Sequence, residues 1–395
     1  MSAFALVMQI VFWFSLALVG YTYFAYPVVL FFCYSLAQLR RDWRYLFDRE
    51  NRRVSSLEEG EVPSVSLLIP AFNEEARLRQ KISNIREMDY PTEKIQIVFA
   101  SDGSTDGTNE ILKRLEDPNI EAIFLSSRSG KAVALNQAVL HARHEILVFS
   151  DASTLFAPDT LRKLSRHFSD GRIGAACGAL RFQASAESQQ TEGVYWKYES
   201  MIRLMETRLG ATLTASGAAY ALRRSAYVPL APGTVLDDFV IPMNARKAGY
   251  RVVYDPEAIA TDYAPESIKG EFTRRVRLAT GSFASLMFLL SVPMGGFGRF
   301  AFVSHKLLRW ILPLILCSLL ISNVVLLPHP GYGLFGLLQL FFYLWAGLGF
   351  VLRERMRNVR FALLAYFLLA MNVAFLVGMF RCLTKREEGV WQRVQ

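Results

Sequence analysis

Hydrophobic residues are concentrated at the two ends of the chain. Residues 4–36 contain no charged side chain, and this run exceeds the roughly 20 residues that a helix needs to cross about 30 Å of hydrocarbon. No basic segment precedes it and no small-residue cleavage site is evident, so a retained transmembrane helix fits better than a signal peptide. Three further apolar runs lie at 307–327, 332–352 and 361–381. The pattern therefore predicts one membrane segment before a polar middle region and three after it.

The middle region, about residues 54–280, has the charge content of a water-soluble domain. Its short apolar runs are rich in β-branched and aromatic residues, which is typical of strands buried in a parallel sheet. These runs are 65–69, 95–100, 120–125 and 146–150. Helix-length segments separate them, and one begins at Gly130. The alternation predicts an α/β domain, whose ligands bind beyond the carboxyl ends of the strands.

Polar side chains follow each of these predicted strands. The groups are Pro70, Asn73 and Glu74 after the first strand; Asp102, Gly103, Asp106 and Gly107 after the second; Gly130 and Lys131 after the third; and Asp151 and Ser153 after the fourth. Any one of these groups is also ordinary turn chemistry. Because all four follow strand ends, we expect them to form one composite site.

A nucleoside diphosphate matches the chemistry of such a site. Asp102 and Glu74 offer acceptors for the base and the ribose, while Lys131, a helix N-terminus and a metal ion would face the pyrophosphate. The chain has no GxxxxGK[ST] segment and no GxGxxG after the first strand. A P-loop and a dinucleotide site are therefore not expected.

Composition agrees with a membrane protein. Hydrophobic residues make up 52% of the chain and charged residues 20%, and the mean hydropathy of +0.23 is high for a soluble protein. The net charge of +9 arises largely beside the membrane segments, and no nucleic-acid-binding motif is present. Membrane lipids with anionic headgroups are thus the expected partners, and nucleic acid is not. The four cysteines are scattered and form neither a disulfide framework nor a metal spacing.

Arginine-rich segments predict the orientation. Residues 40–53 and 353–360 are basic, and the positive-inside rule assigns both to the cytoplasm, together with the middle domain. One conflict remains, because a third C-terminal crossing at 361–381 would leave the basic tail outside. Either the tail breaks the rule, or one C-terminal segment is interfacial or re-entrant.

Several segments carry a family resemblance. VSLLIPAFNEE, FASDGSTDGTNEIL, SGKAVALNQAV and ILVFSDAS, in this order, resemble the nucleotide-binding half of family-2 glycosyltransferases with the GT-A fold. The similarity covers about residues 64–285, and the flanking segments resemble membrane-embedded members such as cellulose, hyaluronan and poly-N-acetylglucosamine synthases. The implied organisation is a transmembrane helix (1–38), a basic cytoplasmic linker (39–63), a GT-A domain (64–281), an interfacial helix (282–304), transmembrane segments (305–382) and a basic tail (383–395).

The resemblance also implies catalytic roles. TVLDDFVIP resembles the segment with the family's catalytic carboxylate, which falls on Asp238, preceded by Asp237. A carboxylate there would take the proton from the attacking acceptor hydroxyl; the alternative is a helix N-cap. By the same resemblance Asp151 binds Mg²⁺ or Mn²⁺, and Ser153 stands where many nucleotide-sugar enzymes have a second carboxylate. We therefore expect the metal to bind weakly unless the donor supplies oxygen ligands.

Two later segments concern the diphosphate and the acceptor. EFTRRVRL keeps the Arg-x-Arg core of the Gln-Arg-x-Arg-Trp signature of processive synthases, which implies that Arg275 and Arg277 hold the departing diphosphate. Leu278 stands in place of the tryptophan that binds the acceptor sugar, which puts processive synthesis in doubt. TASGAAY resembles the loop beside the acceptor, with Ser216 and Gly217 allowing close approach.

The expected function is an inverting, metal-dependent transfer of a sugar from a nucleotide-diphosphate donor, first of all a UDP-sugar. The expected acceptor is a lipid-linked molecule or a surface polysaccharide at a bacterial inner membrane, with the catalytic domain in the cytoplasm. Two alternatives stay open. One is a processive synthase that extrudes its polymer, and the other is a non-catalytic subunit that binds sugar nucleotides for an export complex.

Overall fold

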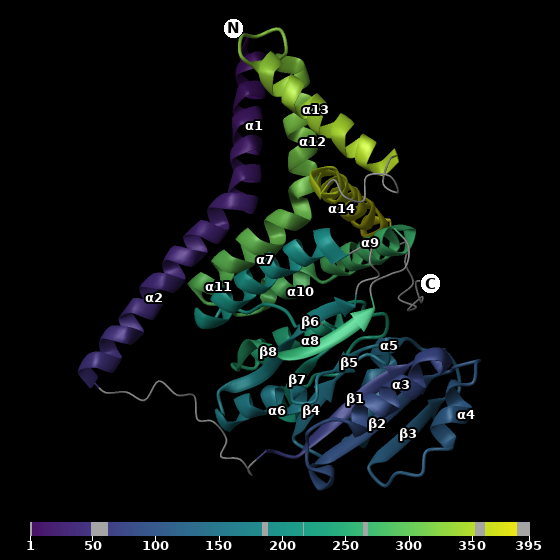
Figure 1. Ribbon diagram of the computed structural model, residues 1–395. Coiled ribbons are helices and arrows are strands. Elements are labelled where there is room, and N and C mark those ends of the chain that lie inside the picture. The colour runs from purple at the N-terminus through teal and green to yellow at the C-terminus, as the bar shows by residue number, and fades with distance from the viewer. Residues whose placement is uncertain are drawn as a thin grey trace.

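The computed structural model describes residues 2–48, 62–183, 189–215, 217–263, 268–351 and 360–384. Four helices in this part of the chain are long and apolar enough to cross a membrane: Ala3–Phe47, Gly296–Leu326, Tyr332–Val351 and Ala365–Leu383. One precedes the α/β domain and three follow it, on the same side of that domain in Figure 1. The expected flanking of the domain by apolar helices is confirmed.

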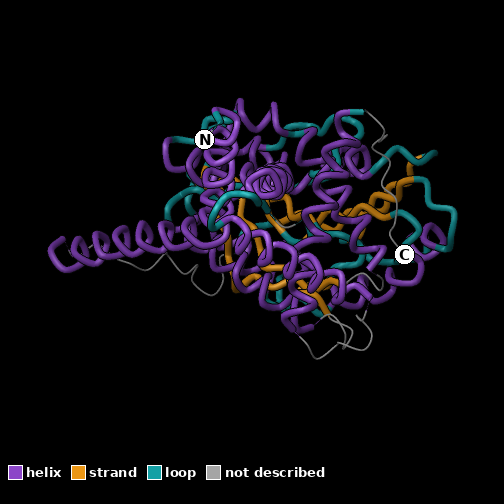
Figure 2. Tube along the Cα trace, turned by 90° about the horizontal axis from the view of Figure 1, so that it is seen from above, coloured by secondary structure: helices purple, strands orange, loops and turns teal. Residues whose placement is uncertain are grey.

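The N-terminal helix is longer than the predicted span. It consists of α1 (Ala3–Gly20), a π-helical segment η1 (Tyr21–Ala25) and α2 (Tyr26–Asp48). The direction of the helix changes after α1, and α2 projects sideways from the body of the protein (Figures 1 and 2). A π-helical segment is a known cause of such a bend. Residues 39–48 were expected in a linker, but they continue this helix.

The first half of the α/β domain has the expected parallel strands. These are β1 (Val65–Ala71), β2 (Ile95–Asp102), β3 (Ile120–Leu125) and β4 (Ile146–Phe149), arranged in the order β3-β2-β1-β4. The connections contain α3 (Glu75–Arg86), the short turn η2 (Thr92–Lys94), α4 (Thr108–Lys113) and α5 (Lys131–His141). Strand order reverses at β1, which lies between β2 and β4, so a ligand crevice is expected at that edge.

The second half turns the parallel sheet into a mixed sheet of eight strands. Its strands are β5 (Leu155–Phe156), β6 (Ile173–Gln183), β7 (Tyr220–Arg223) and β8 (Arg251–Tyr263). β7 is antiparallel to both β4 and β6, whereas β8 is parallel to β6 and antiparallel to β5. The helical elements here are α6 (Thr160–Ser165), η3 (Arg166–Ser169), α7 (Gln189–Arg208), η4 (Arg224–Ala226) and α8 (Asp237–Lys247).

Alternation along the strands builds a core on each face of the sheet. Leu67 and Ile69 belong to one buried cluster, and Leu68, between them, belongs to the other. A third buried cluster joins the domain to the membrane helices and contains Leu213, Phe239 and Trp310. Segments of the α/β domain after β6 are therefore packed directly against the base of the membrane helices.

The segment expected as one interfacial helix (282–304) is divided. After α9 (Ile268–Ala284) come α10 (Leu286–Ser291) and α11 (Gly296–Ala301), which continues through the π-helical η5 (Phe302–Leu307) into α12 (Leu308–Leu326). Pro293 and Gly295 lie in the break after α10, and proline cannot continue the hydrogen-bond ladder of a helix. Residues 296–304 thus belong to a long apolar helix, followed by α13 (Tyr332–Val351) and α14 (Arg360–Leu383).

Candidate active site

The loop that precedes α5 is organised by Asp102 at the end of β2. The Asp102 side chain is buried, and its two carboxylate oxygens accept hydrogen bonds from the amides of Ser129 (2.7 Å) and Gly130 (2.8 Å). Gly103 has a φ of 65°, and a Cβ there would lie 2.5 Å from the Arg128 nitrogen. These contacts fix the start of α5, whose first residue is Lys131.

Lys131 joins two parts of the sequence that are about 90 residues apart. Its ammonium group lies 2.8 Å from Asp151 Oδ1 and 3.1 Å from Asp237 Oδ2. Burial disfavours the charged form, but the Asp151 and Asp237 carboxylates outweigh it and raise the pKa of Lys131 above its ordinary value. The strand end after β4 and the start of α8 therefore meet at one cation.

Asp238 lies beside this cluster in the first turn of α8. The N-cap residue is Leu236, so the alternative of an N-cap role for Asp237 or Asp238 is not what the structure has. The Asp238 carbonyl accepts a hydrogen bond from the Ala215 amide (3.0 Å). Burial and the neighbouring Asp237 carboxylate raise the pKa of Asp238. A carboxylate with a raised pKa is better matched to accepting a proton near neutral pH.

The predicted acceptor loop passes next to Asp238. A Cβ built on Gly217 would lie 3.2 Å from Asp238 Oδ2, so glycine leaves room directly in front of this carboxylate. Ser216, the other predicted acceptor residue, lies outside the described residues. The structure thus brings Gly217 and the candidate base together.

The residues after β1 contact the loop after β2. Asn73 has a positive φ of 53°, and its Oδ1 accepts a hydrogen bond from the Thr105 amide (2.8 Å). Glu74 is buried, and its amide donates a hydrogen bond to the hydroxyl of Thr108 (2.8 Å), the first residue of α4. Pro70 lies within β1, opposite Ala100 of β2. These predicted nucleotide-binding residues therefore line one edge of the parallel sheet.

The loop after β4 offers only oxygen atoms to a metal. Burial, and next the Asp151 charge, raise the pKa of Asp262, and the nearby Ser153 side chain opposes this shift. Within the described ranges, no three His, Cys, Asp or Glu side chains form a group that could hold a metal by themselves. Two carboxylates and a hydroxyl nevertheless match the hard oxygen donors that Mg²⁺ and Mn²⁺ take, if a ligand supplies the remaining oxygens.

The buried Lys81 binds the loop after β4 through hydrogen bonds. Lys81 of α3 is fully buried, and its ammonium group donates to Ser150 Oγ (2.7 Å) and to the Thr154 carbonyl. Burial lowers the pKa of Lys81 to about 7, although the Asp151 and Asp262 carboxylates oppose this shift. Lys81 therefore fixes both ends of the segment that presents Asp151 and Ser153.

The two predicted diphosphate-binding arginines point in different directions. Arg277 lies within the electrostatic influence of Asp151, Asp237 and Asp238, and its buried Nε has no hydrogen-bond partner among the described residues. Arg275 instead pairs with Glu271 on its own helix and lies over the ring of Phe367, 5.6 Å from its centroid. Residues two apart on a helix do not share a face. The charges of the site carboxylates thus act on Arg277, whereas Arg275 pairs with Glu271, although its Nη2 is also buried without a hydrogen-bond partner among the described residues.

Sequence reasoning missed three side chains of this site. Asp262 stands at the end of β8, whose irregular polar pattern gave no strand signal, and Lys81 was hidden inside an amphipathic helix. The Tyr220 hydroxyl is buried near Asp237 and Asp238, which together with burial raise the pKa of Tyr220, and it has no hydrogen-bond partner in the described part of the chain. An orphaned hydroxyl beside carboxylates is a candidate ligand contact.

The fold and the site together define a class of protein. A parallel nucleotide-binding half joined to a mixed half, with buried carboxylates where they meet, is the arrangement of a GT-A nucleotide-sugar transferase. The mannosyltransferase PcManGT from Pyrobaculum calidifontis, solved in complex with GDP-Man and Mn²⁺, superposes with a TM-score of 0.67 at 23% identity, over 92% of this chain and 99% of that one. This likeness confirms the predicted fold.

Residues 66–228 match the family described as Glycosyl transferase family 2, so the chain carries a domain of that family. The poly-beta-1,6-N-acetyl-D-glucosamine synthase of Staphylococcus aureus (strain COL) is 28% identical over 255 residues, which are 62% of this chain and 61% of that protein. An N-acetylglucosaminyltransferase of Mesorhizobium japonicum is 28% identical over 253 residues, 59% of each chain. The chain thus matches about three fifths of the length of these relatives. The predicted resemblance to family-2 glycosyltransferases is confirmed.

Proposed function

We propose that this protein transfers a sugar from a nucleoside diphosphate sugar, a UDP-sugar first of all, to a membrane-associated acceptor. The observation that carries the proposal is the meeting of Lys131, Asp151 and Asp237 beside Asp238. These groups come from both halves of the domain and meet at one place, which supports their assignment to the donor site. The names of the relatives, which include an N-acetylglucosamine polymer synthase, support a sugar nucleotide as the donor.

The chemistry assigned to this chain is a single displacement. The acceptor hydroxyl oxygen attacks the anomeric carbon while the bond from that carbon to the diphosphate breaks, and the hydroxyl proton passes to Asp238. Attack from the side opposite the leaving group inverts the anomeric configuration. Arg277 and Lys131 hold positive charge near the departing diphosphate, which stabilises the negative charge that develops there. Because Gly217 has no side chain, there is space for the acceptor next to the Asp238 carboxylate.

A divalent cation, Mg²⁺ or Mn²⁺, would be held by Asp151 and Asp262, with Ser153 between them. Bound there, it would neutralise charge on the diphosphate. Ser153 is a weak ligand, and Lys131 already pairs with Asp151. We therefore assign much of the metal coordination to the oxygens of the donor itself. The Mn²⁺ in the complex of the Pyrobaculum mannosyltransferase supports use of a divalent ion.

The proposed acceptor is lipid-linked or a growing polysaccharide, because Ala211 and Leu213, directly before the acceptor loop, pack against the base of the membrane helices. Leu278 lies in that same apolar cluster, without an aromatic ring for stacking on a sugar. This favours addition of single sugars over processive extrusion. The proposed location is the inner membrane of a bacterium, with the catalytic domain in the cytoplasm.

The test is a screen of UDP-, GDP- and dTDP-sugars for nucleotide release by membranes that contain the protein. We expect release with one class of donor, and a loss of at least about 100-fold in Asp238→Asn, because the amide cannot take the proton. Asp89→Asn, at an exposed ion pair with Arg162, is the matched control and should retain activity. Wild-type turnover in Asp238→Asn would refute the mechanism. Nucleotide binding without any turnover would favour the non-catalytic subunit.

A further inference from the structure

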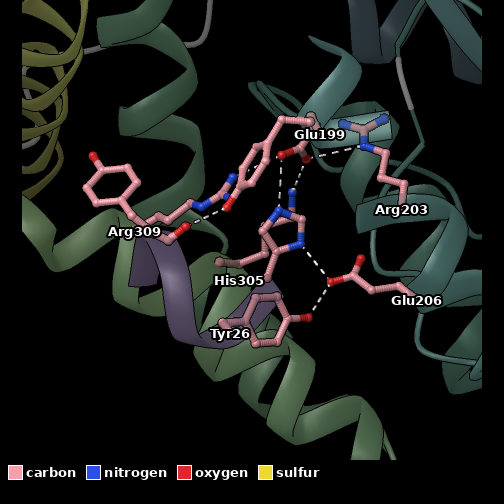
Figure 3. Close-up of polar contacts among 9 residues, drawn as sticks. Tyr26, Glu199, Arg203, Glu206, His305 and Arg309 are labelled. Carbon is pink, nitrogen blue, oxygen red and sulfur yellow. Dashed lines mark hydrogen bonds and ion pairs between the residues drawn. The ribbon is translucent and has the colours of Figure 1, made fainter. Parts of the chain in front are cut away.

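A second cluster of charged side chains lies outside the candidate active site, between the catalytic domain and the membrane helices. Figure 3 shows its members, which come from α2, α7, η5 and α12. They are Tyr26, Glu199, Arg203, Glu206, His305, Lys306 and Arg309. His305 is at its centre and has no exposed surface. Charged groups buried at this depth are costly unless they are paired, so their arrangement is informative.

His305 bridges two glutamates of α7. Its Nδ1 lies 2.7 Å from Glu206 Oε1 and its Nε2 lies 3.1 Å from Glu199 Oε2. An ionised carboxylate can only accept hydrogen bonds, so both ring nitrogens must carry a proton if both glutamates are ionised. His305 then acts as a doubly donating cation that joins α7 to the membrane helix of η5 and α12.

The two glutamates depend on His305 to different degrees. Glu199 also contacts Arg203 (3.3 Å), Lys306 (3.4 Å) and Arg309 (2.9 Å). Burial opposes its ionisation, but His305 and the other cations hold the pKa of Glu199 well below the ordinary value. In the described part of the chain, the Glu206 carboxylate is bonded by His305 and by the Tyr26 hydroxyl (2.8 Å). Of the two glutamates, Glu206 therefore loses the larger share of its contacts when the contact with His305 breaks.

Glu206 also lies in the last turn of α7, shortly before segment 211–215, which leads into the predicted acceptor loop (214–220). The Glu206 carbonyl accepts a hydrogen bond from the amide of Ala211 (2.7 Å). Ala211 is the first residue of segment 211–215. Four residues further on, the Ala215 amide donates to the Asp238 carbonyl (3.0 Å). Between these points, Arg246 donates to the carbonyls of Gly210 (2.9 Å) and Thr212 (3.0 Å). A continuous set of contacts thus runs from the membrane helix to the candidate base.

We propose that Glu206 and His305 are positioning residues, which hold the acceptor loop and Asp238 at a fixed place relative to the membrane helices. The proposal rests on the proposed function for its acceptor, which reaches the site from the membrane. The residues after β1 and β2 that are assigned to the base and ribose of the nucleotide are separate from this contact, because Asn73 and Asp102 hold them within the parallel half. Loss of the contact should therefore affect the acceptor and spare the nucleotide.

Three variants of the full-length protein test this proposal. Glu206→Ala removes the carboxylate, whereas Glu206→Gln keeps an oxygen that can accept from both His305 and Tyr26. Lys306→Gln is the matched control in the same cluster, since among the described residues Lys306 makes a 3.4 Å contact to Glu199 and none to Glu206. The first readout is hydrogen–deuterium exchange of segment 211–215, which needs no substrate. The second is transfer to lipids extracted from the expression host, together with binding of UDP and GDP by calorimetry.

We expect Glu206→Ala to speed exchange in segment 211–215 and to lower transfer by about tenfold or more, as a small displacement of a catalytic group does. Nucleotide affinity should stay within about threefold of wild type, well under the tenfold that 1.4 kcal/mol represents. Glu206→Gln and Lys306→Gln should resemble wild type in all readouts. Unchanged exchange in Glu206→Ala, or a parallel loss of nucleotide affinity, would overturn the proposal. A wild-type protein that transfers no sugar would instead refute the proposed function, and the exchange result would still decide whether Glu206 fixes the loop.

Discussion

At the residue scale, the carboxylates of the site differ because their neighbours differ. Asp151 and Asp237 share Lys131, whereas Asp238 has no ion pair within the described part of the chain. Burial raises the pKa of both Asp237 and Asp238, so the ion pair, and not the pKa shift, sets Asp238 apart. Asp262 has the hydroxyl of Ser153 near it, where many related sites have a second carboxylate. The division of roles therefore follows from one lysine and one serine.

Ser153→Asp should raise the affinity for Mn²⁺ in the absence of donor. The new carboxylate would join Asp151 and Asp262, and a third anionic ligand strengthens binding of a hard cation. We expect a gain of about tenfold, or about 1.4 kcal/mol. Titration calorimetry with Mn²⁺ alone measures this, and Ser169→Asp, which adds the same charge on the far turn η3, should leave the affinity unchanged.

Removing a carboxylate at Asp262 is the complementary test of the metal site. Asp262→Asn should weaken Mn²⁺ binding in the presence of UDP, because a neutral amide oxygen replaces an anionic ligand. Tight Mn²⁺ binding by the donor-free wild type, or an unchanged affinity in Asp262→Asn, would contradict the assignment of these residues to the metal.

At the scale of elements, a close helix–helix contact positions Arg277, which is proposed to bind the diphosphate. Gly378 of α14 packs against α9, the helix that carries Arg277: a Cβ on Gly378 would lie 2.5 Å from Ala279 Cβ and 2.8 Å from the Val276 carbonyl. The Thr280 hydroxyl also reaches the Gly378 carbonyl (3.3 Å). The two helices can approach this closely only because residue 378 has no side chain.

Gly378→Ala should therefore push α9 away from α14. Overpacking of this kind costs about 1–3 kcal/mol, more than alanine gains in helix propensity. We expect a lower unfolding temperature in detergent and weaker UDP binding, since Arg277 moves with α9. Gly347→Ala is the matched control, because a Cβ at that position on α13 meets no atom within 4 Å. Equal behaviour of the two variants would show that this contact does not position α9.

The hydrophobic pattern of each strand decided whether it could be predicted from the sequence. The first four strands were predictable because each is a continuous apolar run ended by polar residues, and these ends carried Asp102, Lys131 and Asp151. The later strands were not, because β7 is four residues long and β8 mixes buried and exposed positions over 13 residues. Asp262 and Tyr220 lie on these strands. Side-chain direction was also beyond reach, as the separation of Arg275 from Arg277 illustrates.

At the scale of the whole molecule, the position of α14 bears on the conflict between the basic tail and the positive-inside rule. α14 is long and apolar enough to cross a membrane. It nevertheless contacts α9 at two places 11 residues apart, Phe367 and Gly378, and the two helices lie next to each other in Figure 1. α9 carries Glu271, Arg274, Arg275 and Arg277, which cannot lie in hydrocarbon without a large cost.

We therefore expect α14 to lie at the cytoplasmic boundary of the membrane instead of crossing it. Three crossings then remain, by α1, by the helix of α11 to α12, and by α13. An odd number of crossings puts the N-terminus outside and both the catalytic domain and the tail inside, which satisfies the positive-inside rule for all three basic segments. A crossing by α14 would instead pull the arginines of α9 toward the bilayer or separate α9 from Gly378.

Cysteine labelling in sealed right-side-out vesicles distinguishes the two topologies. In a background where the four native cysteines are replaced by alanine, Gln395→Cys should react with a membrane-impermeant maleimide only after permeabilisation. Lys247→Cys, on the exposed end of α8, should behave in the same way, and Pro330→Cys, in the exposed turn between α12 and α13, should react without permeabilisation. If Gln395→Cys reacts in intact vesicles as Pro330→Cys does, α14 crosses the membrane. The charged face of α9 would then have to be shielded from lipid by the catalytic domain alone.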